Sequence, residues 1–177
     1  MKRKLTIRIF TSIYVLAIAV WLGGSLIRLA VAYDIYVPAT ELSMKTHYTD
    51  ELRLHTVRLF GMGALYTDIA YGCAIFAVII LLILMKGKMR IKGWPVISFT
   101  LFLLTVPLEV LMIYFDIRLN LAIHNGLLTT FNSDLVRDFF ISRFTKFNFV
   151  SPSAYLCGAS SLIFSIVRPL DRYKSDS

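Results

Sequence analysis

The sequence predicts an all-α integral membrane protein: a four-helix bundle with helical outer loops and an interfacial amphipathic helix. Three observations predict this fold. Hydrophobic residues make up 57% of the 177 residues, charged residues only 17%, and the mean hydropathy is +0.69. Four apolar segments approach or exceed the ~20 residues that cross a ~30 Å hydrocarbon core. Basic residues gather in short clusters beside these segments, where they indicate topology. We expect one transmembrane domain, 1–177, with spans at about 9–33, 59–85, 95–117 and 148–168.

The first span follows a basic N-terminus. Its apolar run is longer than the roughly 7–15 residues of the hydrophobic region of a signal peptide, so we expect the segment to be kept as a helix. The small residues Gly23, Gly24 and Ser25 leave cleavage at that point as an alternative.

The connection between the first two spans is too long for a simple turn. Thr49 is suited to cap a helix whose first turn holds Asp50 and Glu51, because carboxylates are favoured at the positive end of a helix. We expect this helix to continue directly into the second span.

The connection between the last two spans shows a second helical pattern. Asn125 and Gly126 are typical of a helix end, and Asn132 or Ser133 is suited to cap a new helix. Four apolar residues then recur at helical spacing: Val136, Phe140, Phe144 and Phe147. This pattern predicts an amphipathic helix in the outer membrane interface, packed against the rim of the bundle.

The basic residues form three clusters that four spans place on one side of the membrane. The clusters are Lys2, Arg3, Lys4 and Arg8; Lys86, Lys88, Arg90 and Lys92; and Arg168, Arg172 and Lys174. The positive-inside rule predicts that this side is cytoplasmic, with both termini there, and we expect a bacterial plasma (inner) membrane. The net charge of +8 therefore indicates topology, and no nucleic-acid partner is expected.

Four ionisable residues lie inside the predicted spans, where charge is costly and usually has a partner or a function. The candidate ligand-binding or ion-pair pocket consists of these four and two aromatic neighbours: Arg28, Asp68, Glu109, Asp116, Tyr71 and Trp21. The four charges converge on the outer half, which predicts a polar pocket opening outward between the first three spans. Two interpretations remain open: Arg28 pairs with Asp68 or Glu109 to hold helices together, or the pocket binds a ligand, ion or proton.

The stretch Trp21-Leu22-Gly23-Gly24 resembles the Trp-x-Gly-Gly helix of copper-resistance-D-type and related small bacterial membrane domains. In that type of helix a histidine often stands seven residues before the tryptophan, and Tyr14 takes this position here. The resemblance covers only these residues, so no cofactor is predicted from it.

The histidines are weak candidates for metal binding. His47, His55 and His124 all fall on the predicted outer side, and Glu51 stands four residues before His55. These residue types suit zinc or copper, but three histidines are easily explained as solvated loop residues and interfacial anchors.

The sequence contains none of the familiar nucleotide-binding, hydrolase or zinc-protease motifs. The leading hypothesis is therefore a non-catalytic membrane protein, either an accessory subunit or a small-molecule-binding protein. A small oligomeric transporter or proton-coupled carrier is one alternative, and a membrane-embedded enzyme acting on a lipid or redox substrate is another. Expected partners are membrane lipids and either partner membrane subunits or further copies of the chain.

Overall fold

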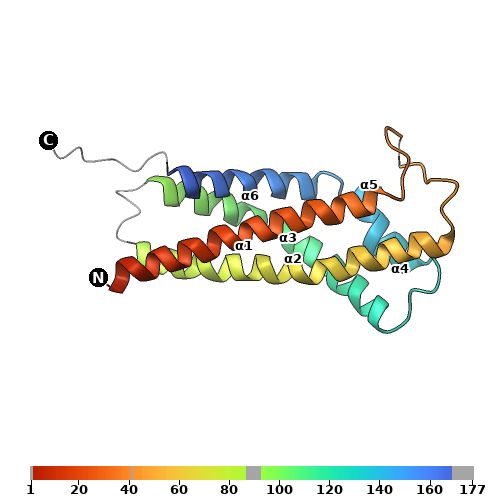
Figure 1. Cartoon of the computed structure of the whole chain (residues 1–177), viewed down its shortest axis with the longest axis horizontal. Helices are drawn as coiled ribbons and strands as arrows, with labels where there is room; N and C mark the ends of the chain where they lie inside the picture. Colours follow the sequence, from red (N-terminus) through yellow and green to blue (C-terminus); the bar gives the residue numbers. More distant parts are fainter. Residues whose placement is uncertain (1, 41, 87–92, 169–177) are drawn as a thin grey trace.

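Four long helices form the body of the protein (Figure 1). The computed structural model describes residues 2–40, 42–86 and 93–168. The long helices are α1 (Lys2–Tyr33), α2 (Asp50–Met85), α3 (Gly93–His124) and α6 (Val150–Val167), and each is long and apolar enough to cross a membrane. The predicted fold class, an all-α membrane bundle, is confirmed.

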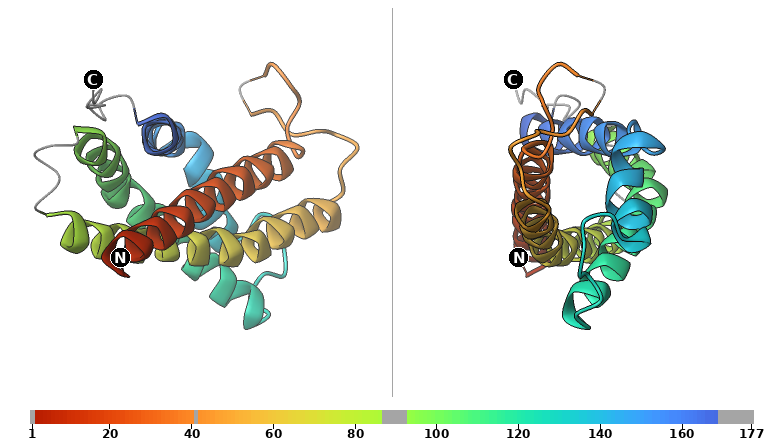
Figure 2. Two further views of the ribbon diagram at one scale, coloured as in Figure 1. Left: turned by 60° about the vertical axis from the view of Figure 1, so that its left-hand side comes forward. Right: turned by 90° about the vertical axis from the view of Figure 1, so that its right-hand side faces the viewer.

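The helices are arranged so that α1 packs mainly on α2, and α3 packs mainly on α6. The start of α1, the end of α2, the start of α3 and the end of α6 all lie at one end of the bundle (Figures 1 and 2). We call this part the terminal half. The opposite part, which carries the connections 34–49 and 125–149, is the loop half.

Helix α2 begins outside the expected span, as its cap predicted. The Thr49 side chain accepts a hydrogen bond from the Leu52 backbone N–H at 3.3 Å, and one uninterrupted helix follows to Met85. At 1.5 Å per residue its 36 residues extend about 54 Å, well beyond a ~30 Å hydrocarbon core. Its first turns therefore belong to the loop half.

Helix α3 is longer than the span predicted to end near residue 117. It continues to His124, and the chain then leaves the helix through Gly126, whose φ is +67°. Residue 117 marks the expected end of the apolar span, and the helix itself ends at the predicted Asn125 and Gly126. A helix end is set by its capping residues, and Asn125 and Gly126 supply that signal later in the sequence.

The connection between α3 and α6 contains the predicted amphipathic helix. It is built from α4 (Asp134–Val136), a π-helical turn η1 (Arg137–Ile141) and α5 (Ser142–Thr145), and Ser133 caps it by accepting from the Val136 N–H at 3.4 Å. Val136, Phe140 and Phe144 are buried against the bundle. This segment closes one side of the loop half.

Some of the topology signals fall outside the described residues: Lys88, Arg90, Lys92, Arg172 and Lys174. Within the described part, Arg3 at the start of α1 donates from Nη2 to the Leu84 carbonyl oxygen at 2.6 Å. This contact fixes the first turn of α1 against the last turns of α2.

Candidate functional site

Arg28 of α1 lies at the centre of the polar cluster in the loop half. All three kinds of nitrogen in its guanidinium donate a hydrogen bond: Nε to the Phe60 carbonyl oxygen at 3.2 Å, Nη1 to Thr67 Oγ1 at 2.9 Å, and Nη2 to Asp116 Oδ1 at 2.6 Å. The guanidinium carbon also lies 4.3 Å from the centre of the Phe60 ring. Arg28 therefore joins α1 to both α2 and α3.

Two glycines make room for this arginine. A Cβ on Gly24 would lie 2.7 Å from Thr67 Cγ2, and a Cβ on Gly63 would lie 3.1 Å from Arg28 Cγ. Glycine at these positions lets α1 and α2 approach closely and lets the arginine stem pass between them. Gly24 is thus a point of close contact between α1 and α2.

Asp116 of α3 is shared by two arginines. Its Oδ1 lies 2.6 Å from Nη2 of Arg28 and 2.6 Å from Nη2 of Arg143, which comes from α5. The exposed fractions are 2% for Asp116, 9% for Arg28 and 8% for Arg143. One carboxylate thus faces two buried guanidinium groups, and these three residues carry a formal charge of +1.

The acid that pairs with Arg28 is neither of the two partners that the sequence analysis expected for it. Asp68 or Glu109 was expected, whereas the observed partner is Asp116. Glu109 and Asp116 are both buried on the inner face of α3, so depth along the helix decides between them, and Asp116 is level with Arg28.

Arg143 uses its donors less completely than Arg28. Its Nη2 donates to the Met112 carbonyl oxygen at 2.7 Å in addition to Asp116. Its Nε is buried and has no hydrogen-bond partner in the described part of the chain. A buried donor without a partner costs about 1–3 kcal/mol, so this N–H is a place where an acceptor would stabilise the protein.

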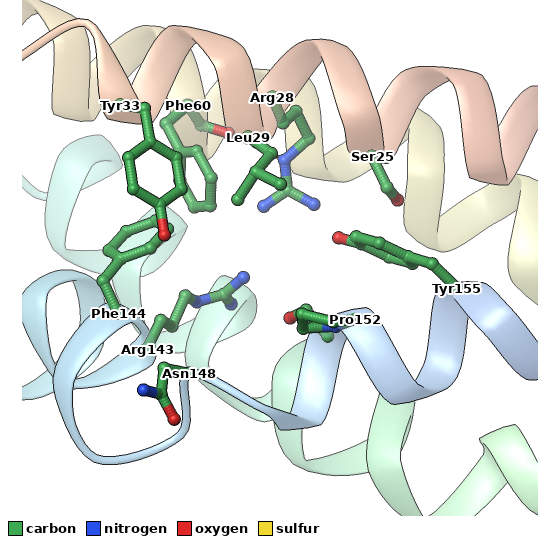
Figure 3. A pocket seen from close by; sticks show the side chains of 11 residues that line it. Ser25, Arg28, Leu29, Tyr33, Phe60, Arg143, Phe144, Asn148, Pro152 and Tyr155 are labelled. Carbon is green, nitrogen blue, oxygen red and sulfur yellow. Dashed lines mark hydrogen bonds between the residues drawn. The ribbon is translucent and has the colours of Figure 1, made fainter. Parts of the chain in front are cut away.

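Beside the two arginines lies a partly enclosed cavity of about 60 Å³. In Figure 3 the guanidinium groups of Arg28 and Arg143 and the hydroxyl of Tyr155 point into it from three sides. The remaining lining residues are Ser25, Leu29, Tyr33, Phe60, Phe144, Asn148, Ser151 and Pro152. A single water needs about 10–15 Å³ measured in this way, so the cavity has room for several waters or one small polar group.

The cavity is not where the sequence placed it. A pocket between the first three spans was expected, but α5 and the start of α6 supply most of one wall. Tyr155 of α6 lines the cavity together with Ser25 of α1 and Ser151. The fourth span and the connection before it are therefore part of the site.

Three predicted site residues lie next to the cavity and form part of the packed core. The Trp21 ring lies 5.1 Å from the Tyr71 ring and 5.9 Å from the Tyr155 ring. The Tyr71 hydroxyl lies 2.8 Å from Thr105 Oγ1. Trp21, Tyr71 and Glu109 are buried, and through Tyr155 they contact the cavity wall.

Asp68 has a different position. Its carboxylate is within electrostatic range of Asp116, Arg28 and Arg143. It lines a separate groove of about 430 Å³ between α2 and α3, together with Met62, Leu65, Tyr66, Ile117, Asn120, Leu121 and His124. The predicted six-residue pocket is thus divided between the cavity, the core and this groove.

The candidate metal ligands do not come together. Within residues 2–40, 42–86 and 93–168, no group of three or more His, Cys, Asp or Glu side chains is placed to hold a metal ion. His124 lines the α2–α3 groove, and the ring of His47 packs against Tyr48. Glu51 and His55 are exposed on the first turns of α2.

The loop after α1 is organised by an exposed carboxylate. Asp34 accepts hydrogen bonds from the Tyr48 hydroxyl and from Lys45 Nζ, the latter at 2.9 Å. These contacts lower the pKa of Asp34 and raise the pKa values of Lys45 and Tyr48. Burial raises the pKa of the nearby Tyr36 to about 12. The loop therefore keeps its shape through groups that remain in their usual charge states near neutral pH.

Sequence reasoning missed Arg143, Ser25 and Tyr155. Arg143 was grouped with the charged residues of the outer connection. Its spacing of three residues from Phe140 and four from Phe147 places it on the apolar face, and this signal was available in the sequence. The two hydroxyl residues give no comparable signal, because serine and tyrosine are common in membrane helices.

Comparisons with family models, with curated proteins and with solved structures give no match. The function is therefore inferred from the cavity and its charged residues.

Proposed function

We propose that this membrane protein binds a small molecule through a carboxylate or phosphate group held between Arg28 and Arg143. The observation that carries the proposal is the buried Nε of Arg143, which has no partner in the described residues and belongs to a guanidinium that points into the cavity. A guanidinium offers its donors in a rigid fork that matches the oxygens of carboxylates and phosphates.

The charge around the cavity supports an anion. Arg28 and Arg143 share one oxygen of Asp116, so these three residues carry a formal charge of +1, while Asp68 and Glu109 interact with the cluster electrostatically without an ion pair to either arginine. In a poorly hydrated environment such an excess attracts a negative group more strongly than it would in water. The hydroxyl groups of Ser25 and Tyr155 supply further hydrogen-bonding groups on the opposite wall.

The size of the cavity limits the ligand. Its volume of about 60 Å³ is far below the ≈300–1,000 Å³ of sites that enclose a drug-sized molecule. Only a small anion, or the anionic end of a larger molecule, fits between the arginines. The protein is then a binding protein or an accessory subunit, in agreement with the leading sequence hypothesis.

The sidedness of the site follows from the basic clusters. If the terminal half faces the cytoplasm, as the positive-inside rule predicts, the cavity lies in the outer half of the membrane. We propose a plasma (inner) membrane with both termini cytoplasmic and a ligand that reaches the cavity from the outer side.

Native mass spectrometry of the full chain, extracted gently from its own membrane, tests this function. We expect a bound small molecule of defined mass that is lost in Arg143→Gln. Arg137→Gln is the matched control, because it removes the same charge from an arginine of the same segment whose side chain is 64% exposed. A protein without any small-molecule adduct, or equal loss of the adduct in both variants, would overturn the proposal. Stoichiometric protein partners would instead favour an accessory subunit.

A carrier is the second candidate, and the position of Asp68 favours it. Asp68 lines the α2–α3 groove and also interacts electrostatically with Arg28 and Arg143. A cation or proton exchanged at Asp68 would change the charge around Asp116. Four spans are few for a carrier, so an oligomer is required. Reconstituted vesicles should then show a flux that Asp68→Asn abolishes, and the absence of such a flux contradicts this candidate.

A further inference from the structure

A second surface feature lies in the terminal half, far from the arginine cavity along the bundle. It is a groove of about 620 Å³ between α1 and α6, open along its length. On the α1 side it is lined by Arg8, Ser12 and Leu16, and on the α6 side by Ser165 and Arg168. None of these residues belongs to the site described above.

Along α1 the chemistry of the groove changes with depth. Arg8 is nearest the end of the bundle, Ser12 follows about one turn further in, and Leu16 about one turn beyond that. One helical turn is about 5.4 Å, so a basic group, a hydroxyl and an alkyl group succeed one another over about 11 Å. Ala19 continues the apolar part.

On the α6 side the basic group again lies nearest the end of the bundle and the hydroxyl further in, although the chain runs the other way. Arg168 directly follows the end of the helix, and Ser165 lies about one turn further in. Because α6 ends at the end of the bundle where α1 begins (Figure 1), Arg8 and Arg168 are the residues of their helices that line the groove nearest that end. The two walls therefore present one shared gradient from positive to apolar.

Arg8 and Arg168 have hydrogen-bond donors that the described residues do not use. Arg8 is exposed, and within the described residues it forms no ion pair. Within the described residues Arg168 donates only from Nε, to the Ser165 carbonyl oxygen at 3.3 Å, while its guanidinium carbon lies 5.0 Å from the centre of the Trp94 ring. Its terminal nitrogens are left for an external acceptor.

We propose that this groove binds one anionic phospholipid from the leaflet on the side of the termini. The phosphate lies between Arg8 and Arg168, the glycerol and ester region lies beside Ser12, and an acyl chain packs along Leu16 and Ala19. Basic sites between membrane helices are suited to anionic headgroups. A zwitterionic phospholipid would fit the apolar part equally well, but it would bring a cationic amine next to two arginines.

Native mass spectrometry with added lipid tests the site on the purified full chain in detergent. The probes are phosphatidylglycerol and phosphatidylcholine with identical acyl chains. We expect the first phosphatidylglycerol to bind at least about tenfold more tightly than phosphatidylcholine. The double variant Arg8→Gln/Arg168→Gln should lose about thirtyfold in phosphatidylglycerol affinity, the effect of two basic groups near a membrane surface.

The matched control is Lys4→Gln/Lys86→Gln, which removes two charges from the same end of the bundle outside the groove. It should retain the preference for phosphatidylglycerol. A further variant, Ala19→Phe, keeps both arginines and fills the apolar part of the groove, and it should weaken the binding of the lipid. Equal affinity for the two lipids, equal loss in the control, or unchanged binding in Ala19→Phe would overturn the proposal. Arg143→Gln should leave lipid binding unchanged, so this test is independent of the proposed function.

Discussion

The two halves of the bundle hold their polar groups in different ways. In the terminal half, neutral hydroxyls connect three helices: the Tyr14 hydroxyl lies 2.5 Å from Ser161 Oγ, and Ser98 Oγ lies 3.1 Å from Ser161 Oγ and 2.6 Å from Ser165 Oγ. In the loop half, Arg28, Asp116 and Arg143 carry full charges.

This difference indicates where a ligand belongs. The hydroxyls bond to one another and to backbone oxygens, so this network is satisfied by the protein alone, although the buried indole N–H of Trp94 at the start of α3 has no partner in the described residues. The charged cluster leaves the Arg143 Nε without a partner and has a cavity beside it. Hydroxyl networks are sufficient to join helices, whereas a buried charge that exceeds its counter-charge is costly unless something else binds there. The loop half is therefore the part of the core in which we propose that a ligand binds.

The strongest test of this contrast removes the shared carboxylate. Asp116→Asn leaves two buried guanidiniums without an anionic partner, and we expect a loss of about 3–5 kcal/mol in the free energy of unfolding. Thermal or denaturant unfolding in one detergent measures it. The control Asp134→Asn affects an exposed pair with Arg137 and should cost less than about 1 kcal/mol. Equal effects of the two substitutions would contradict the contrast between the halves.

The next test concerns the boundary between the halves, where Trp21 packs against α6. A Cβ added to Gly158 would overlap the Trp21 ring, so Gly158→Ala should destabilise the fold by about 1–3 kcal/mol. Gly72→Ala is the control, because nothing lies within 4 Å of a Cβ there. That substitution should be neutral or stabilising by up to about 1 kcal/mol. The melting temperatures of the two variants check the prediction, and a stable Gly158→Ala protein would show that Trp21 is free to shift.

A smaller effect is expected in the terminal half. Tyr14→Phe removes the hydroxyl that contacts Ser161 and keeps the ring, which packs against Phe99 and Phe102. The loss should be about 0.5–1.5 kcal/mol, the usual net value of one hydrogen bond. Tyr66→Phe, at a position 73% exposed, should not change the unfolding transition. A loss as large as that of Asp116→Asn would remove the distinction between neutral and charged networks.

The smallest expected effect on stability concerns the ion pair between Asp34 and Lys45. This pair is exposed in the loop after α1, in contrast to the buried pairs of Asp116. Hydrogen bonds from Tyr48 and Lys45 lower the pKa of Asp34. Because the folded-state pKa is the lower one, the stabilising contribution is complete above the ordinary value of about 4 and is lost as the pH falls through the folded-state pKa. Tyr48→Phe should raise the pKa of Asp34 toward its ordinary value, as measured by NMR titration of the carboxyl carbon. An unchanged pKa would mean that Lys45 alone sets it.

Much of the fold could be predicted from local sequence. The four spans follow from long apolar runs, and the starts of α2 and α4 follow from Thr49 and Ser133, whose side chains accept the expected hydrogen bonds. The amphipathic segment follows from the spacing of its aromatic residues. Each of these features depends on residues close to one another in the chain, so a single sequence contains the necessary information.

The site could be predicted only in part. Arg28 and Asp116 were recognisable because a charge inside an apolar helix is costly and therefore informative. Arg143 was overlooked because charged residues are common in connections between spans, and its burial depends on the segment folding back over the bundle.

The sequence by itself therefore determined the membrane class, the helices and the set of intramembrane charges, since these depend on composition and on local spacing. The tertiary structure decided which acid pairs with Arg28, that Arg143 joins it, and that the cavity lies between α1, α5 and α6. The physical reason is that pairing depends on the rotation and depth of each helix relative to the others. Packing across the whole bundle fixes these quantities, and close helix contacts such as that at Gly24 set the final distances.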